Sequence, residues 1–207
     1  TKAYILMALV PGITACIWIK KTKQKYIGTK FLATHLMYFS ILFNIHHVFP
    51  QYNLAKTIQW KQSKYYSLIS EVKPGSAIES VPLDGSTWSV VRNTPHAVYS
   101  TLCRPFVWES RSPVILMAAL ENAVLLFLLI IILISFNPKK KITEPLFYLC
   151  IYFAFIIFAL TGLVTPIMGA IVRYKIPALP FLIIAFLFIY DQKTLNRSKR
   201  EKAIQIR

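Results

Sequence analysis

The feature that most constrains the fold is one long apolar run, roughly residues 113–136, which contains the sequence PVILMAALENAVLLFLLIIILIS. A helix that crosses a membrane needs about 20 mainly apolar residues, and this run supplies them with a single acidic residue, Glu121. A soluble domain of this size has no core large enough to bury such a helix on all sides. The run therefore predicts a helix that spans a membrane.

Four further runs qualify or nearly qualify as membrane spans. They lie roughly at residues 3–19, 31–48, 145–163 and 165–190, and the second of these, FLATHLMYFSILFNIHHV, is the most polar. The composition agrees with a chain whose solvent is the bilayer, because 56% of its residues are hydrophobic and only 15% are charged. We expect an all-α polytopic integral membrane protein with about five transmembrane helices.

Basic residues are concentrated in three segments that flank these runs. Residues 20–30, 137–144 and 191–207 carry five, three and six lysines or arginines, which is 14 of the 24 in the chain, against three acidic residues. Five alternating spans put all three segments on one side, and short loops rich in Lys and Arg remain in the cytoplasm. The net charge of +16 therefore indicates membrane topology, and we expect no nucleic acid as a partner.

This topology divides the chain into four parts. Residues 1–48 form two transmembrane helices with a basic cytoplasmic loop, and residues 49–112 form one long external, amphipathic or interfacial connection. Residues 113–190 form three transmembrane helices, and residues 191–207 form a basic cytoplasmic tail. The N-terminus is then outside and the C-terminus inside. Because the chain opens on Thr1 and enters an apolar run almost at once, we expect it to be the C-terminal part of a longer polytopic protein.

The external connection contains two predicted helices. Residues 54–72 repeat apolar side chains at helical spacing. Lysines beside Trp60 suit a helix that lies on the lipid headgroups, while a packed helix of a small outer cap is an open alternative. Farther along, Thr94 is a plausible N-cap with Pro95 at the first helical position.

Two ionisable residues fall inside predicted spans, where a charge is costly and marks a candidate functional site. Counted at 1.5 Å per residue from Pro113 and from Thr165, Glu121 and Arg173 both lie roughly 12 Å below the outer surface. We therefore predict an intramembrane polar pair between Glu121 and Arg173.

The residues around Arg173 allow two arrangements of the last span. Pro177 and Pro180 interrupt the helix, and an interrupted helix at membrane depth is tolerated where it lines a cavity or is buried in protein. In the alternative, the fourth span continues past Pro166, so that Arg173 and Lys175 lie at the membrane surface and extend toward water.

The other reactive side chains form no recognisable site. Three cysteines are an odd number and suggest neither a disulfide framework nor a metal cluster, and the histidines have no carboxylate or cysteine at ligand spacing. The sequence contains no phosphate-binding glycine loop and no nucleophile elbow. We expect no metal and no cofactor, and we assign no catalytic residue.

Two stretches carry a family resemblance, RPFVWESRSPVILMAALENAVLL and, two spans later, GAIVRYKIPALPFLIIAF. Together they resemble the C-terminal membrane region of bacterial surface-polysaccharide assembly proteins, the multi-spanning glycosyltransferase and O-antigen polymerase or ligase-like proteins. The resemblance covers roughly residues 75–190. It implies a protein of the bacterial inner membrane that takes a polyprenyl-phosphate-linked sugar at the outer face, among membrane lipids. Such families keep their catalytic carboxylate in an early external loop, which would lie outside this segment.

The resemblance also implies a set of binding residues. In that family setting, arginine and lysine hold the lipid-linked phosphate, and Glu121 orients Arg173 or shuttles a proton. The residues implied to bind substrate or lipid phosphate are Arg104, Trp108, Glu109, Arg173, Tyr174 and Lys175.

A second hypothesis belongs to a different class of protein. The chain would be a non-catalytic integral-membrane subunit that packs within a larger respiratory, secretion or transport complex. Glu121 and Arg173 would then be a structural pair, and the partners would be other membrane subunits or the missing N-terminal part.

Overall fold

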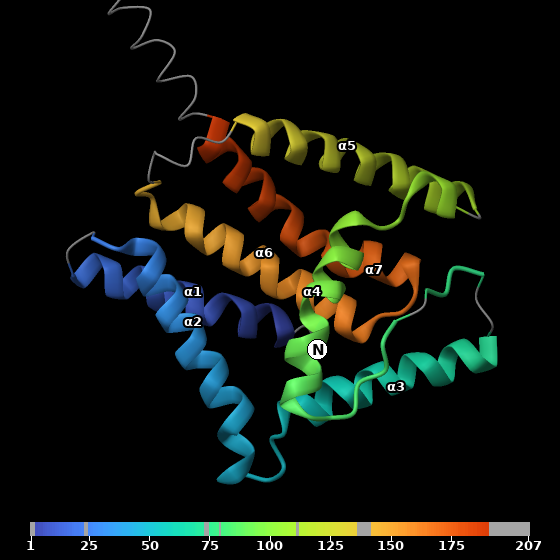
Figure 1. Cartoon of the computed structure of the whole chain (residues 1–207), viewed down its shortest axis with the longest axis horizontal. Helices are drawn as coiled ribbons and strands as arrows, with labels where there is room; N and C mark the ends of the chain where they lie inside the picture. Colours follow the sequence, from blue (N-terminus) through green and yellow to red (C-terminus); the bar gives the residue numbers. More distant parts are fainter. Residues whose placement is uncertain are drawn as a thin grey trace, which may run out of the picture.

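The protein is built almost entirely of α-helices, as Figure 1 shows for the computed structural model of the chain. The structure describes residues 3–22, 25–72, 75–78, 80–110, 112–135 and 142–190. Within these residues the one pairing of extended segments is an isolated antiparallel bridge between Ala77 and Ile167. The predicted all-α fold class is confirmed.

Seven α-helices and three 3-10 helices follow one another in the described residues. The α-helices are α1 (Ala3–Lys21), α2 (Ile27–Asn44), α3 (Leu54–Val72), α4 (Thr87–Cys103), α5 (Pro113–Ser135), α6 (Pro145–Val164) and α7 (Met168–Lys175). The 3-10 helices are η1 (Ile45–His47), η2 (Val107–Glu109) and η3 (Ile176–Ala178), and a last helical stretch, residues 179–190, continues directly from η3.

Four helical segments are long and apolar enough to cross a membrane. They cover Tyr4–Lys21, Pro113–Ile132, Pro145–Val164 and Met168–Tyr190, which correspond to the first, third, fourth and fifth predicted spans. The protein is therefore a multi-pass membrane protein. The predicted basic tail, residues 191–207, lies outside the described residues.

The predicted second span corresponds to α2, which is less apolar than these four segments. Two of its polar side chains face the protein, because Thr34 and His35 are only 7% and 5% exposed. The side chains of Leu36, Met37 and Ile41 are exposed instead. Thr34 and His35 thus lie inside the bundle, while Ser40 and Asn44 remain on the exposed surface of the helix among apolar side chains.

The direction of the helices gives α2 a specific place in the topology. In Figure 1, α1, α5 and residues 179–190 run toward the same end of the molecule, and α6 runs the opposite way. The connection from α1 to α5 must therefore return the chain to the other end. Helix α2 begins at the shared end and leads away from it (Figure 1), which is the path that the five-span prediction requires.

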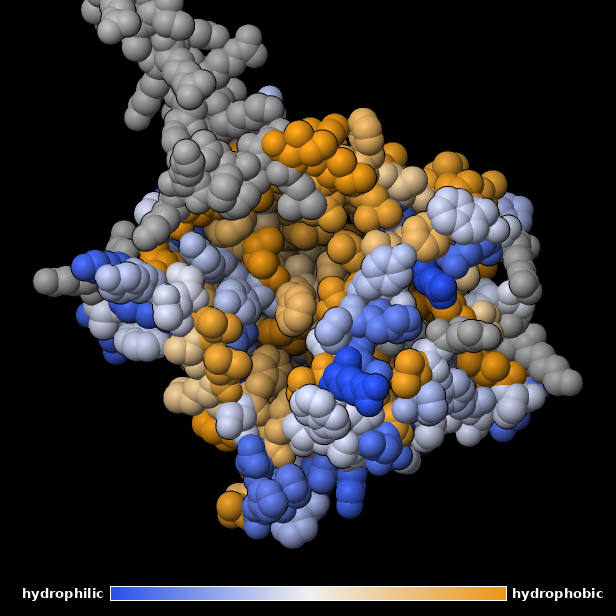
Figure 2. Space-filling model, viewed as in Figure 1, coloured by the Kyte–Doolittle hydropathy of each residue, from blue (hydrophilic) through white to orange (hydrophobic). Residues whose placement is uncertain are grey.

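Helix α6 is the centre of the bundle. Half of its apolar stretch, Pro145–Val164, is buried inside the protein, whereas only 11% of the apolar stretch Pro113–Ile132 of α5 is buried. The side chains of Phe153 and Ile157 pack in a core with residues of α1 and of the last span. Figure 2 shows hydrophobic residues gathered over α5 and hydrophilic residues toward α3 and α4. Helix α5 thus lies at the periphery and keeps most of its apolar surface uncovered.

The segment between α2 and α4 packs as a cap over the end of α6. Gln62 of α3 is 3% exposed, and its Nε2 donates to the carbonyl oxygens of Val81 at 3.0 Å and Leu163 at 2.9 Å. Its Oε1 accepts a hydrogen bond from the backbone N–H of Leu83 at 2.9 Å. Of the two interpretations of α3, the packed helix of a cap describes its inner face; its other face still exposes Trp60.

Helix α4 begins earlier than predicted. Ser86, rather than Thr94, is the N-cap, and its Oγ accepts from the backbone N–H of Ser89 at 3.0 Å. Pro95 lies inside the helix, and the Thr94 hydroxyl donates to the carbonyl oxygen of Val90 at 2.8 Å. Both residues suit the start of a helix, but the turn of Asp84 and Ser86 before Thr87 provides a stronger start signal.

Candidate functional site

The turn between α6 and α7 fixes where the last span begins. Helix α6 ends at Val164, and Pro166, which has no N–H, accepts a hydrogen bond from the Ile78 N–H at 2.8 Å. The Met168 N–H then donates to the carbonyl oxygen of Ser76 at 3.0 Å. The alternative in which the fourth span continues past Pro166 is therefore wrong. Arg173, Tyr174 and Lys175 belong to the last helical span, Met168–Tyr190.

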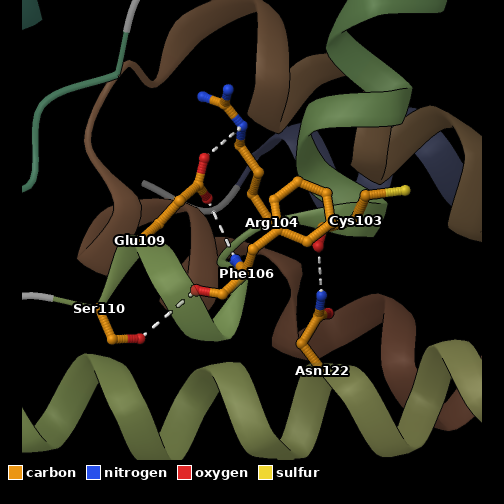
Figure 3. Close-up of polar contacts among 6 residues, drawn as sticks. All are labelled: Cys103, Arg104, Phe106, Glu109, Ser110 and Asn122. Carbon is orange, nitrogen blue, oxygen red and sulfur yellow. Dashed lines mark hydrogen bonds and ion pairs between the residues drawn. The ribbon is translucent and has the colours of Figure 1, made fainter.

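Lys175 is the cation that points into the protein. This residue is 4% exposed, and its Nζ donates to Asn122 Oδ1 at 2.6 Å and to the Arg104 carbonyl oxygen at 3.1 Å. Asn122, which is 2% exposed, donates through Nδ2 to the carbonyl oxygen of Cys103 at 2.7 Å (Figure 3). We call these four residues, Cys103, Arg104, Asn122 and Lys175, the Lys175 cluster.

The end of α4 explains why the Lys175 cluster forms. The last carbonyl groups of a helix have no partner inside the helix, and Pro105 cannot continue α4 because it lacks an N–H. The carbonyl oxygens of Cys103 and Arg104 are thus left as acceptors. Asn122 from α5 and Lys175 from α7 supply the donors, so the cluster joins three helices.

Arg104 also takes part in the one salt bridge of the described residues. Its Nε lies 3.4 Å from Glu109 Oε1, and Glu109 Oε2 accepts from the Phe106 backbone N–H at 3.1 Å. Figure 3 shows the two terminal nitrogens of the Arg104 guanidinium pointing away from Glu109. The edge of the guanidinium that carries the two terminal nitrogens, which can bind a carboxylate or phosphate with two parallel hydrogen bonds, is therefore directed away from Glu109.

Trp108 stands at the edge of this region. It is 80% exposed, and its ring stacks on Phe106 with centroids 4.7 Å apart and an interplanar angle of 6°. An exposed indole at the end of a transmembrane helix is typical of the membrane interface. Trp108 is thus close to Arg104 and Glu109 in the chain but takes no part in their ion pair.

Arg173 and Tyr174 belong to a separate cluster on another side of α7. Arg173 is exposed, and its Nη2 donates to Tyr174 Oη at 3.2 Å. Tyr65 of α3 donates to the same oxygen at 3.1 Å, and the Tyr4 ring lies edge-on to Tyr174 at 6.5 Å. Burial and the hydrogen bond with Tyr174 raise the pKa of Tyr65 to about 12.

The predicted pair of Glu121 and Arg173 is not formed. Both residues are exposed, and the salt bridge of the described residues is that of Arg104 with Glu109. Equal depth did not ensure contact, because consecutive residues of an α-helix point about 100° apart. Asn122 and Lys175 face the bundle, and each is only one or two positions from the predicted partners.

The structure thus sorts the predicted binding residues into two groups. Arg104, Glu109 and Lys175 come together near α5, while Arg173 and Tyr174 lie toward α3. Asn122 was missed as a partner at the level of the sequence, although an amide beside Glu121 in an apolar run is a visible signal. The carbonyl oxygens of α4 could not have been identified there, since they act as acceptors only because the helix ends at that point.

The site offers little enclosed space and no metal centre. A cavity of about 10 Å³ is lined by Asn122, Lys175 and mainly leucine side chains, which is about the room that one water requires. Among the described residues, no three His, Cys, Asp or Glu side chains come together as a group that could hold a metal ion.

Comparison with known proteins adds no family. No protein family, curated protein or solved structure matches the chain. The site and the topology therefore carry what can be inferred about function.

Proposed function

We propose that the chain is the membrane-embedded part of a glycosyltransferase-like or polysaccharide-assembly protein of the bacterial inner membrane. It would hold a polyprenyl-phosphate-linked sugar at the outer face, with the catalytic carboxylate supplied from outside this segment. The observation that carries the proposal is the guanidinium of Arg104, whose two terminal nitrogens point away from Glu109 (Figure 3), on a residue whose backbone carbonyl oxygen accepts a hydrogen bond from the buried ammonium of Lys175.

The chemistry of these groups suits a lipid-linked phosphate. Arginine binds phosphate oxygens with two parallel hydrogen bonds, and lysine acts as a point charge. Lys175 Nζ has three protons and two protein acceptors, and its charge adds to the positive potential around Arg104.

The proposal orients the protein with its N-terminus outside and its C-terminus inside. Lys20 and Lys21 lie in the last turn of α1, at the end shared by α5 and residues 179–190 (Figure 1). Lysines at that end favour the cytoplasm. The Lys175 cluster, at the opposite half of the bundle, then belongs to the outer leaflet.

The direct test is binding of a polyprenyl phosphate to the full-length protein in nanodiscs, measured by native mass spectrometry. Arg104→Ala should weaken binding about tenfold or more, because a hydrogen bond to a charged group contributes about 1.5–3 kcal/mol. Arg92→Ala is the matched control, because Arg92 is exposed on α4 and should leave binding unchanged. Glu109→Gln breaks the ion pair but keeps the guanidinium, so it separates loss of structure from loss of phosphate contact. Wild-type binding by Arg104→Ala would refute the proposal.

A second candidate function is supported by the periphery of the bundle. Only 11% of the apolar stretch Pro113–Ile132 of α5 is buried, which leaves a long face that can contact either lipid or another protein. The chain would then be a non-catalytic membrane subunit. Loss of glycan by Arg104→Ala with an intact complex on native gels favours the first function, and loss of the complex with glycan transfer retained favours the second.

A further inference from the structure

Helix α5 presents a continuous stripe to the outside of the bundle, with one carboxylate in it. The apolar members are Val114, Met117, Val124 and Leu128, which are 78%, 68%, 59% and 43% exposed. Glu121 lies among them and is also exposed. We call these five residues the Glu121 stripe; Figure 2 shows the hydrophobic character of the surface over α5.

The position of Glu121 is costly without a partner. Eight residues from Pro113, it lies roughly 12 Å along the helix, where lipid tails cannot solvate a carboxylate. Within the described residues it makes no salt bridge. Lys175 attracts it electrostatically, but the ammonium directs its hydrogen bonds to Asn122 and Arg104. The protein therefore leaves the carboxylate oxygens of Glu121 without a direct cationic ligand.

The spacing of the Glu121 stripe is that of a helix-packing seam. Its members follow one another at intervals of three and four residues, as do the residues that face a neighbouring helix in a coiled arrangement. In a membrane, an intramembrane charge faces a bundle interior or a partner rather than lipid. A second copy of this chain, related by two-fold symmetry, would bring one Glu121 against the other, and like charges at short distance repel.

We propose that the Glu121 stripe binds a transmembrane helix of a different protein chain, and that this helix carries a lysine or arginine at the depth of Glu121. Charge complementarity on an apolar seam supports this partner, independently of the function proposed above. The apolar members provide packing area, and the ion pair sets the register and the choice of partner.

The experiment uses the full-length protein in its native membrane with a photo-crosslinking amino acid. The probe replaces Met117, one turn from Glu121 in the stripe, or Ile130, which is 53% exposed and lies about 180° from Glu121 around the helix. The Met117 probe should crosslink to a transmembrane peptide of another chain that has a lysine or arginine within one turn. The Ile130 probe should not capture that peptide.

Charge variants decide whether the carboxylate carries the contact. Glu121→Gln keeps the side-chain shape, and it should lower the crosslinking yield at Met117 at least fivefold. Replacing the cation of the partner with methionine should lower it equally and leaves this chain unchanged. Exchange of the two charges between the chains should restore the yield.

Several results would overturn the inference. They are a crosslink from Met117 to a second copy of this chain, a captured helix without a basic residue near the crosslink, no protein crosslink, or a wild-type yield with Glu121→Gln.

Discussion

Replacement of Asn122 with leucine should destabilise the protein more than removal of the charge that Asn122 holds. Asn122→Leu roughly keeps the side-chain volume but removes the acceptor 2.6 Å from Lys175 Nζ and the donor 2.7 Å from the Cys103 carbonyl oxygen. Lys175 then remains a buried cation with one protein acceptor, the carbonyl oxygen of Arg104. Lys175→Met removes the cation together with the cost of burying it.

The magnitudes follow from the hydrogen bonds that each variant breaks. A hydrogen bond to a charged group contributes about 1.5–3 kcal/mol and a neutral one about 1 kcal/mol, so Asn122→Leu should cost about 3 kcal/mol. Lys175→Met leaves only neutral acceptors unsatisfied and should cost about 1–2 kcal/mol. The double variant should cost less than Asn122→Leu alone, because replacing both partners of a buried polar contact by apolar groups is often nearly neutral.

The assay is reversible unfolding of the purified protein in mixed micelles, followed by circular dichroism as the fraction of denaturing detergent rises. The expected loss for Asn122→Leu corresponds to an unfolding constant roughly 150-fold larger. Asn44→Leu is the control, because Asn44 is exposed and its amide donates to the Ser40 carbonyl oxygen of its own helix. That control should stay within about 0.5 kcal/mol of the wild type.

Two results would contradict this reasoning. One is a cost of Asn122→Leu no larger than that of Lys175→Met. The other is a double variant whose cost equals the sum of the single costs, since two residues that hold one charge together must couple. Either result would mean that the ammonium is solvated in some other way, for example by water that enters the bundle.

Three further predictions concern the cap and its contact with α6. Gly162→Ala should lower the free energy of unfolding, measured by thermal denaturation, by about 2 kcal/mol, because a β-carbon there overlaps the Ala97 carbonyl oxygen. Gly169→Ala is the control: its β-carbon meets open space, so the variant should be neutral or stabilising. Gln62→Ala removes three hydrogen bonds and should raise amide exchange in α3 at least tenfold, with exchange in α6 unchanged. Because the pKa of Tyr65 rises from 10.0 to about 12 on folding, its contribution to stability is complete below pH 10 and is lost as the pH approaches 12. A tyrosine absorbance titration should lose its latest step in Tyr65→Phe.

The spans could be predicted from the sequence because length and apolarity decide them. Residues 113–135 cannot be covered by a soluble fold of this size, and the boundaries of α6 and the last span follow from Pro145 and Pro166. Helix α2 shows the limit of hydropathy, since Thr34 and His35 lower its average while facing the protein. A mean hydropathy taken over a whole helix does not record on which side of the helix a polar group lies.

The sequence could predict the depth of the candidate site residues along their helices, but not which face of each helix points into the bundle. The fixed rise per residue puts residues 121–122 and 173–175 at the same level by residue count alone. Which face of each helix packs depends on contacts between distant segments, such as the Cys103 carbonyl oxygen with Asn122. A single sequence holds no record of those contacts, so the prediction named Glu121 and Arg173 instead of their neighbours.

Hydrogen-bond satisfaction separates the ionisable groups by the kind of role that each can have. Lys175 is deeply buried but has two close acceptors, so its position is explained by the joint that it makes between α4, α5 and α7. Arg104 is held by Glu109 through Nε alone and keeps its terminal nitrogens directed away, and Glu121 has no salt bridge in the described residues. Groups whose bonding capacity the protein itself does not use are the ones that a ligand or a partner can use. Phosphate chemistry is therefore to be tested first at Arg104, and partner recognition at Glu121.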